Sequence, residues 1–162
     1  MEETRLILET ASPRETKAWA RRLASLLKGG ELIALVGDLG AGKTCFIKGL
    51  GRGLQLREEQ ILSPTFTMIQ EHRGRLPLYH IDLYRLERVG LDDLGLREYL
   101  FSEGVAAVEW YDRLSEGEAI ERLAIQIRFA AANRRTIEIV GIGAPYRAMV
   151  ERLRSRQNLD EA

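Results

Sequence analysis

Residues 37–44 of the chain read GDLGAGKT and fit the pattern G-x-x-x-x-G-K-[ST] at every constrained position. An apolar run precedes them at 32–36 and helical spacing follows at 45–50, as this motif requires. Its glycines let successive N–H groups point at a phosphate, next to the partial positive charge of a helix N-terminus. Lys43 would reach the β- and γ-phosphates, and the Thr44 hydroxyl would take one position on Mg²⁺. The motif therefore predicts a site for a nucleoside triphosphate and Mg²⁺.

Two further segments end in a carboxylate that could complete this site. Residues 78–82 and 105–109 each resemble an apolar strand, and they end in Asp82 and Glu109. Ligands collect at the carboxyl ends of strands in open α/β sheets, and hydrolysis needs an acid for the metal and a group that positions water. Periodicity alone leaves both acids open as the metal-binding residue. His80 alternates with Asp82 and faces the same side of its strand, where we expect a hydrogen-bonded packing histidine.

Residues 63–67, with the sequence SPTFT, lie between the predicted P-loop helix and the next strand. Two interpretations stay open for them. Thr65 could meet the γ-phosphate and its Mg²⁺ as the threonine of a switch segment. The same residues could instead form a Ser-Pro turn that starts a strand.

A sheet with helices packed on it must position these residues. Ser12 is the expected N-cap of a first helix, with Glu15 closing a capping box, and Gly29 with Gly30 would end that helix. Spacing predicts strands at 6–8, 32–36 and 105–108, hairpins of 66–70 with 76–83 and of 123–130 with 136–140, a P-loop helix ending near 51–53, and helices at 91–101 and 146–153. The sequence therefore predicts one α/β P-loop NTPase domain over residues 1–162, with a mixed sheet of parallel core strands and antiparallel hairpins flanked by helices.

The charge is balanced overall but unevenly distributed. The chain has 162 residues, 45% of them hydrophobic, with 24 lysines and arginines against 24 acids, which gives no pull toward nucleic acid or membrane. Residues 87–118 hold nine acids and three arginines, whereas residues 121–156 hold eight arginines and three glutamates. Such runs indicate either solvated faces or a docking surface for a partner.

Cysteine usage and hydropathy exclude several classes. Cys45 is the only cysteine, which excludes an internal disulfide framework and a multi-cysteine zinc site, and we expect it to pack inside the P-loop helix. The first residues lack the basic start and long apolar stretch of a leader, and no run approaches the ~18 apolar residues of a membrane span. We expect a soluble, cytoplasmic protein.

Four motifs follow one another along the chain: GDLGAGKT at 37–44, SPTFT at 63–67, HIDLYR at 80–85 and VEW at 108–110. Together they closely resemble the TsaE (YjeE) family of bacterial P-loop ATPases, over nearly the whole chain. That family serves the biosynthesis of threonylcarbamoyladenosine, a modified base next to the anticodon of tRNA. The P-loop is generic, but HxDLYR and EW at this spacing are specific.

The resemblance implies a role for each motif. Thr44 and Glu109 would hold Mg²⁺, so Glu109 outranks Asp82 as the metal acid, and Asp82 would lie near the γ-phosphate. The implied catalytic residues are Lys43, Thr65, Asp82 and Glu109. The implied nucleotide-binding residues are Asp38, Leu39, Gly40, Ala41, Gly42, Lys43, Thr44 and Cys45 of the loop, Trp110 beside Glu109, and Pro13, Glu15, Thr16 and Arg135 on the adenine side. Cys45 and Tyr111 depart from the residues common in the family, and we expect altered packing there without lost activity.

The same resemblance implies ATP and Mg²⁺ as cofactors and the TsaD–TsaB transferase pair as the partner, with tRNA contacted indirectly or weakly and no membrane. In that family a separate enzyme makes threonylcarbamoyl-AMP, and the ATPase resets the transferase assembly between turnovers. No arginine finger can be chosen from the sequence, so we expect slow hydrolysis by the isolated chain and stimulation by a partner.

Three other classes share the P-loop. A small-molecule kinase needs an arginine-bearing lid, for which Arg85, Arg88, Arg97 and Arg113 offer material without a compact signature. A regulatory GTPase would use residues 92–95 as D-x-x-G, yet no strand precedes them and the chain has no Asn-Lys-x-Asp segment to read guanine. A nucleotide sensor without turnover would keep its function when Lys43 is replaced by alanine.

Overall fold

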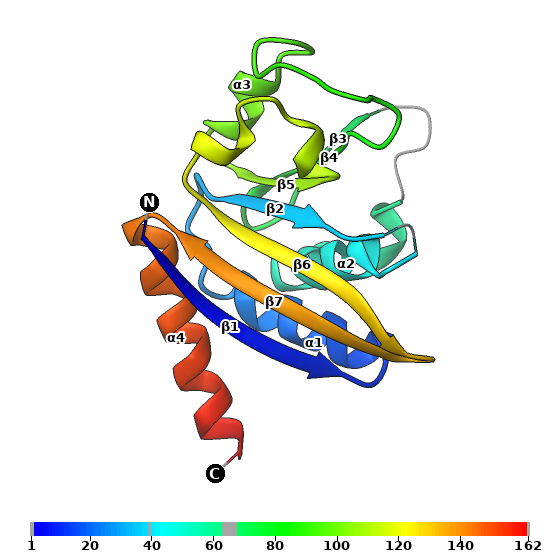
Figure 1. Ribbon diagram of the computed structural model, residues 1–162, viewed down its shortest axis with the longest axis vertical. Coiled ribbons are helices and arrows are strands. Elements are labelled where there is room, and N and C mark those ends of the chain that lie inside the picture. Colours follow the sequence, from blue (N-terminus) through cyan, green and yellow to red (C-terminus); the bar gives the residue numbers. More distant parts are fainter. Residues whose placement is uncertain (1, 39, 63–67, 162) are drawn as a thin grey trace.

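The structure is a computed structural model that describes residues 2–38, 40–62 and 68–161, with the backbone alone for 158–161. The helices and strands, in chain order, are β1 (Glu3–Thr10), α1 (Pro13–Ala24), β2 (Leu32–Val36), α2 (Lys43–Gly53), β3 (Ile69–Arg73), β4 (Pro77–Asp82), α3 (Leu96–Leu100), β5 (Val105–Glu109), β6 (Arg122–Ala131), β7 (Arg134–Ile142) and α4 (Ala144–Glu161). The strands of the described residues form one sheet in the order β1-β7-β6-β2-β5-β4-β3 (Figure 1).

The sheet is mixed, as predicted. Its four central strands, β6, β2, β5 and β4, run parallel. The flanking pairs β1/β7, β7/β6 and β3/β4 are antiparallel. β5 is buried along its whole length and β2 along all but its last residue, since helices or loops cover both faces of the parallel strands. The carboxyl ends of β2, β4 and β5 therefore meet at one edge, where the P-loop begins.

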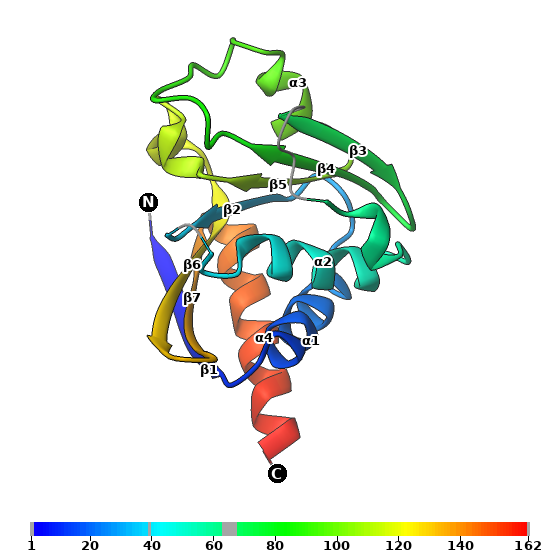
Figure 2. The ribbon, with the colours of Figure 1, turned by 90° about the vertical axis from the view of Figure 1, so that its right-hand side faces the viewer.

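Two apolar cores lie on opposite faces of the sheet. The larger core joins one face to α1, α2 and α4, and Figure 2 shows these three helices on the same side of β1, β6 and β7. The smaller core joins the other face of β2, β4 and β5 to the segment that contains α3 and the turn after β5. Because strand side chains alternate, Leu78, His80 and Asp82 face the larger core, whereas Ile81 and Leu83 face the smaller one.

Helices α1 and α2 cross closely because glycines in α2 face alanines in α1. A Cβ atom at Gly49 would lie 2.7 Å from the Cβ of Ala20, and one at Gly53 would lie 2.4 Å from the Cβ of Ala24. Both glycines sit in a helix, where glycine costs about 1 kcal/mol relative to alanine. The close approach gives them a packing reason, and it places the start of α1 beside the start of α2.

The start of α1 is as predicted, with one change of partner. The backbone N–H of Glu15 donates to the Ser12 hydroxyl at 3.2 Å, which is the N-cap bond. The Glu15 carboxylate accepts from the N–H of Ala11 at 2.5 Å. A capping box would use the N–H of the N-cap Ser12, so the partner is the residue before the one expected.

Three predicted helices have the wrong bounds. Helix α1 ends at Ala24 instead of reaching Gly29, because the chain tightens into turns where Leu26 and Leu27 donate to carbonyls three residues back. Only Leu96–Leu100 of the expected helix at 91–101 is helical, since Leu94 and Gly95 have φ values of 60° and 68°. The last helix is longer than predicted and runs from Ala144 to Glu161. None of the helices in the described part of the chain combines the length and apolar character that a membrane span needs.

Candidate functional site

The P-loop connects the carboxyl end of β2 to the first turn of α2. Gly42 is the N-cap of α2 with a φ of 114°, and Gly40 has a φ of 79°, a region that side chains other than glycine rarely adopt. The N–H of Ala41 donates to the carbonyl of Asp38 at 3.0 Å and tightens the loop. The first N–H groups of a helix lack partners within the helix, so those of Lys43 and Thr44 can serve an anion. Leu39, a predicted member of this loop, lies outside the described residues.

The Lys43 side chain lies within the loop. Its ammonium donates to the carbonyls of Gly37 and Asp38, the second at 2.9 Å. Burial lowers the pKa of Lys43, and the charges of Glu109, Asp82 and Asp38 oppose that shift. An ammonium has three N–H donors, so one remains for a phosphate oxygen.

Glu109 and Thr44 meet behind the loop. The Thr44 hydroxyl donates to the Glu109 carboxylate, with 3.2 Å to each oxygen. Asp82 lies opposite Glu109 in the register of the parallel strands β4 and β5. Both strands end in an acid, as predicted, and the structure shows that they are neighbours. Burial raises the pKa of Asp82, although its Oδ1 accepts from the N–H of Tyr84 at 2.9 Å. The two acids thus differ: Glu109 reaches the P-loop threonine, and Asp82 is tied to the backbone that follows β4.

His80 is the site residue whose contact the sequence did not identify. Its Nε2 lies 2.6 Å from Glu109 Oε2, and the two side chains are only 0% and 5% exposed. The alternation of His80 with Asp82 was the available signal, because it placed His80 on the face of the carboxylates. A hydrogen-bonded packing histidine was expected, and its partner turns out to be the carboxylate behind the P-loop.

Trp110 covers the Lys43 side of the site. Its ring centroid lies 4.4 Å from Lys43 Nζ and 5.0 Å from the guanidinium carbon of Arg113, and the ring of Tyr84 is 5.2 Å away. Its φ of 58° is in the left-handed region, which costs a non-glycine residue free energy of order 1–3 kcal/mol. This backbone conformation turns the chain out of β5, so that the residue after Glu109 lies against the P-loop lysine.

The oxygen groups of the site fit Mg²⁺ held partly by a nucleotide. Thr44 and Glu109 provide a hydroxyl and a carboxylate, and Mg²⁺ usually takes one or two protein oxygens and fills its octahedron with phosphates and water. Among the described residues, no group of three or more histidine, cysteine or acidic side chains could hold a metal without such help. The residues present therefore suit a metal that arrives with phosphates.

The residues predicted for the adenine side gather at one end of the P-loop. Arg135 donates from Nε to the carbonyl of Ala41 at 3.0 Å and stacks on Phe129, with 4.1 Å from guanidinium to ring. The Cys45 thiol lies 3.6 Å from the carbonyl of Pro13, and burial raises the pKa of that thiol. The elevated pKa agrees with the expected packing role of Cys45.

The predicted adenine-side residues at the start of α1 differ in accessibility. Thr16 is 3% exposed, and its hydroxyl pairs with that of Thr10 at 2.7 Å. Glu15 and Pro13 are exposed at the start of α1. The backbone and the exposed edge of this helix start are therefore more available to a base than the Thr16 hydroxyl.

The predicted switch threonine, Thr65, lies outside the described residues, together with residues 63–67. The next described residue, Met68, accepts the backbone N–H of Asp82 at 2.8 Å through its carbonyl. The chain after the SPTFT segment therefore joins the sheet beside one of the two acids.

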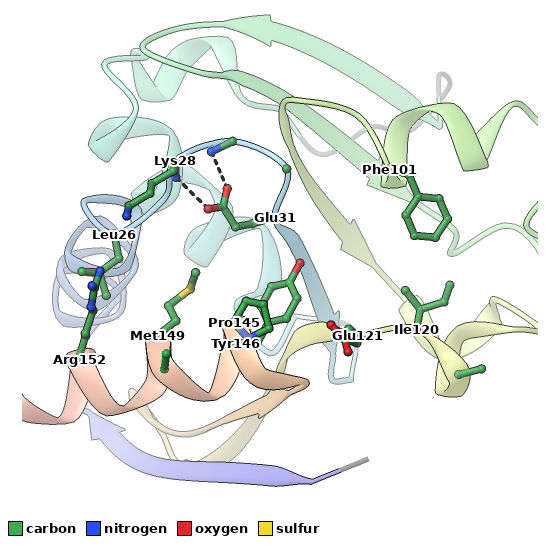
Figure 3. Close-up of a pocket in the computed structure, with 14 residues that line it drawn as sticks. Leu26, Lys28, Glu31, Phe101, Ile120, Glu121, Pro145, Tyr146, Met149 and Arg152 are labelled. Carbon is green, nitrogen blue, oxygen red and sulfur yellow. Dashed lines mark hydrogen bonds between the residues drawn. The ribbon is translucent and has the colours of Figure 1, made fainter.

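A separate cavity lies at the opposite edge of the sheet. The cavity has a volume of about 700 Å³. It lies between the start of α4 and the segment before β2, with Phe101 and Ile120 on its far side (Figure 3). The Glu31 carboxylate accepts the N–H groups of Lys28 and Gly29 there, at 2.8 Å each. Its lining residues include the segment that leads into the amino end of β2, whereas the P-loop follows the carboxyl end of that strand. The candidate site is thus defined by its converging groups and not by this hollow.

Strand, glycine loop and helix, with a threonine and a strand-end carboxylate behind the loop, define an α/β protein of the P-loop class. The sequence model described as "Threonylcarbamoyl adenosine biosynthesis protein TsaE" matches residues 10–137. The chain belongs to the TsaE family of tRNA threonylcarbamoyladenosine biosynthesis proteins, as its motifs suggested.

Known relatives agree with this assignment. The chain is 44% identical over 151 residues to the tRNA threonylcarbamoyladenosine biosynthesis protein TsaE of Bacillus subtilis, covering 93% of this chain and 94% of the relative. It is 40% identical over 129 residues to the TsaE protein of Treponema pallidum, covering 79% and 95%. The crystal structure of Bacillus subtilis YdiB is similar, with a TM-score of 0.79, 39% identity, and coverage of 98% of this chain and 99% of that one.

Proposed function

We propose that this chain is a Mg²⁺-dependent ATPase that acts in the threonylcarbamoyladenosine modification of tRNA. The observation that carries the proposal is the convergence of Lys43, Thr44 and Glu109 at the end of β2 and β5. The Lys43 ammonium lies in the loop, and Thr44 joins the loop helix to the strand-end carboxylate at 3.2 Å. This is the set of groups that phosphate binding and metal binding need together.

Each residue has a defined part in this proposal. The N–H groups at the start of α2 bind the β-phosphate, and Lys43 binds the β- and γ-phosphates with the N–H that its loop carbonyls leave unused. Thr44 and Glu109 would hold Mg²⁺, and the Thr44 hydroxyl donates its hydrogen bond to the Glu109 carboxylate. Bound Mg²⁺ supplies neutralising charge on the phosphate oxygens. Asp82, beside Glu109 at the end of β4, orients the attacking water toward the γ-phosphate.

The partner in this proposal is the TsaD–TsaB transferase pair. The ATPase resets the state of this pair between turnovers in the cytoplasm, and it contacts tRNA through the pair.

We expect slow hydrolysis by the isolated chain. Arg113 donates to the carbonyls of Tyr84 and Leu86, and Arg135 donates to the carbonyl of Ala41. Among the described residues, these two arginines touch the site and already donate to backbone carbonyls, which supports a partner or a rearrangement as the source of further positive charge for the transition state.

The kinase alternative receives less support from the arginines that could have formed a lid. Arg97 pairs with Asp92 at 2.7 Å, and Arg88 donates to Ser115 at 3.1 Å. With Arg113 bound to carbonyls, these side chains hold the segment between β4 and β6 together. A lid arginine has to reach a transferred phosphoryl group, and these three have local partners.

The test is an ATPase assay on the purified chain, alone and with purified TsaD–TsaB pair. We expect stimulation by the pair, and a loss of at least about tenfold on Glu109→Ala, the scale on which metal-site residues act. Glu121→Ala, an exposed acid outside the site, is the control. A pull-down with ATP and Mg²⁺ should recover the pair with the wild type. Rapid hydrolysis that ignores the pair, or labelled γ-phosphate found in a metabolite, would overturn the proposal; the second result would favour the kinase.

A further inference from the structure

His80 and Glu109 form a buried pair on adjacent parallel strands. His80 Nε2 lies 2.6 Å from Glu109 Oε2, with the two side chains 0% and 5% exposed. The same carboxylate accepts from the Thr44 hydroxyl on its other side. One carboxylate is therefore held between an imidazole of β4 and the P-loop threonine of α2.

The chemistry of the three groups sets the direction of each hydrogen bond. An ionised carboxylate only accepts, so His80 donates from Nε2 and Thr44 donates from its hydroxyl. With its hydrogen committed to Glu109, the Thr44 oxygen presents its lone pairs away from the carboxylate. His80 Nδ1 is buried without a partner among the described residues, so the interaction with Glu109 is the polar contact that its ring makes.

We infer that His80 is a positioning residue, which orients Glu109 toward Thr44 and thereby makes nucleotide binding dependent on Mg²⁺. The inference rests on the proposed function, because it concerns the same metal. Residues that orient a metal site through a hydrogen bond typically change metal affinity by about 10–100-fold when replaced.

A competing partner explains why the orientation needs support. The negative charge of Glu109 acts on the buried ammonium of Lys43, which lies in the P-loop. A carboxylate released from His80 can turn toward that ammonium, since an unpaired buried acceptor is costly and a cation is the strongest donor nearby. The turn would take Glu109 from Thr44 and neutralise the lysine that the phosphates require. The hydrogen bond from His80 therefore holds Glu109 toward Thr44 and leaves Lys43 available to the phosphates.

The test compares His80→Leu, which keeps much of the volume but removes the donor, with His80→Gln, which restores an N–H donor. The probe is a non-hydrolysable ATP analogue, titrated calorimetrically with Mg²⁺ and again with EDTA. In EDTA, His80→Gln should bind the analogue as tightly as the wild type does, and His80→Leu should bind it no more tightly, because Glu109 can then pair with Lys43. The wild type and His80→Gln should bind the analogue more tightly in Mg²⁺ than in EDTA. In His80→Leu, this Mg²⁺-dependent increase in affinity should be smaller by about 10–100-fold.

A packing role alone would give a different result. It would lower the Tm of His80→Leu and leave the Mg²⁺-dependent gain intact, which would overturn the inference. If His80→Leu does not fold, His80→Asn with His80→Gln makes the same comparison, because the shorter amide cannot reach Glu109. A wild-type chain without any Mg²⁺-dependent gain overturns the proposed function and this inference with it. A wild-type gain that survives in every folded variant overturns the inference alone.

Discussion

The hydroxyl oxygen of Thr44 lies 3.2 Å from each carboxylate oxygen of Glu109, although 65 residues separate the two in the chain. The contact joins the first turn of α2 to the end of β5, through parallel pairing that places β5 beside β2. It ties the phosphate-binding loop to the sheet edge where Asp82 and His80 also lie. Changes to these residues should therefore separate into effects on phosphate, on metal and on stability.

Replacing Lys43 by alanine should weaken binding of ADP and ATP by about 10–100-fold, because a charge-assisted hydrogen bond contributes about 1.5–3 kcal/mol. AMP, which lacks a β-phosphate, should bind the variant and the wild type alike. Calorimetric titration measures all three nucleotides. Lys48→Ala, in the same helix but outside the loop, is the control. Equal weakening for AMP would show that Lys43 supports the fold of the site and not the phosphates.

Trp110 should report nucleotide binding by its fluorescence. Lys43 Nζ lies 4.4 Å from its ring, so a phosphate that draws the ammonium away removes a cation from the indole face. Emission should change with ATP or ADP and stay constant with AMP. The chain has two tryptophans, so Trp19→Phe should keep the change and Trp110→Phe should abolish it. A signal that survives in Trp110→Phe would contradict the assignment.

Asp82→Asn should stabilise the protein near neutral pH. Burial raises the pKa of Asp82, so the folded protein holds this proton more tightly than the unfolded chain does. The stabilisation is full below the unfolded pKa of about 3.9 and is lost as pH rises through the folded pKa. Asparagine stays uncharged and can still accept from Tyr84.

Thermal unfolding from pH 4 to pH 8 checks this expectation. Asp82→Asn should raise Tm at pH 7, by about 2–4 °C for each kcal/mol of stabilisation in a chain of this size. Its advantage should disappear near pH 4, while ATP hydrolysis falls at all pH values. An advantage that instead grows toward low pH would mean that the ionised carboxylate stabilises the fold.

Gly49→Val should destabilise the protein by about 1–3 kcal/mol, even though glycine is a poor helix former. A new Cβ would lie 2.5 Å from the carbonyl of Lys17 and 2.7 Å from the Cβ of Ala20, so α1 would have to move off α2. Urea unfolding gives the free energy, and Ala18→Val on the exposed side of α1 introduces the same side chain as a control. Equal stability of the two variants would rule out the close crossing.

Local patterns were enough to predict the elements that carry the site. The P-loop, its strand and its helix have fixed spacing, and the glycines, lysine and threonine are adjacent in the chain. The N-cap at Ser12 and both hairpins are also local, because they depend on turn chemistry within a few residues. The helix expected at 91–101 failed, because its apolar spacing competes with left-handed turns at Leu94 and Gly95.

The sequence by itself determined that a P-loop lies between a buried strand and a helix, that two strands end in acids, and that the chain resembles the TsaE family. The resemblance favoured Glu109 over Asp82 as the metal acid, but local patterns left both acids open. The tertiary structure shows that Glu109 contacts Thr44, because that contact depends on the order of β2, β5 and β4 in the sheet. It also decided that His80 contacts Glu109, a pairing set by register between strands that lie far apart in the chain. Short-range periodicity specifies which side of a strand a residue faces, whereas its partner is chosen by long-range packing.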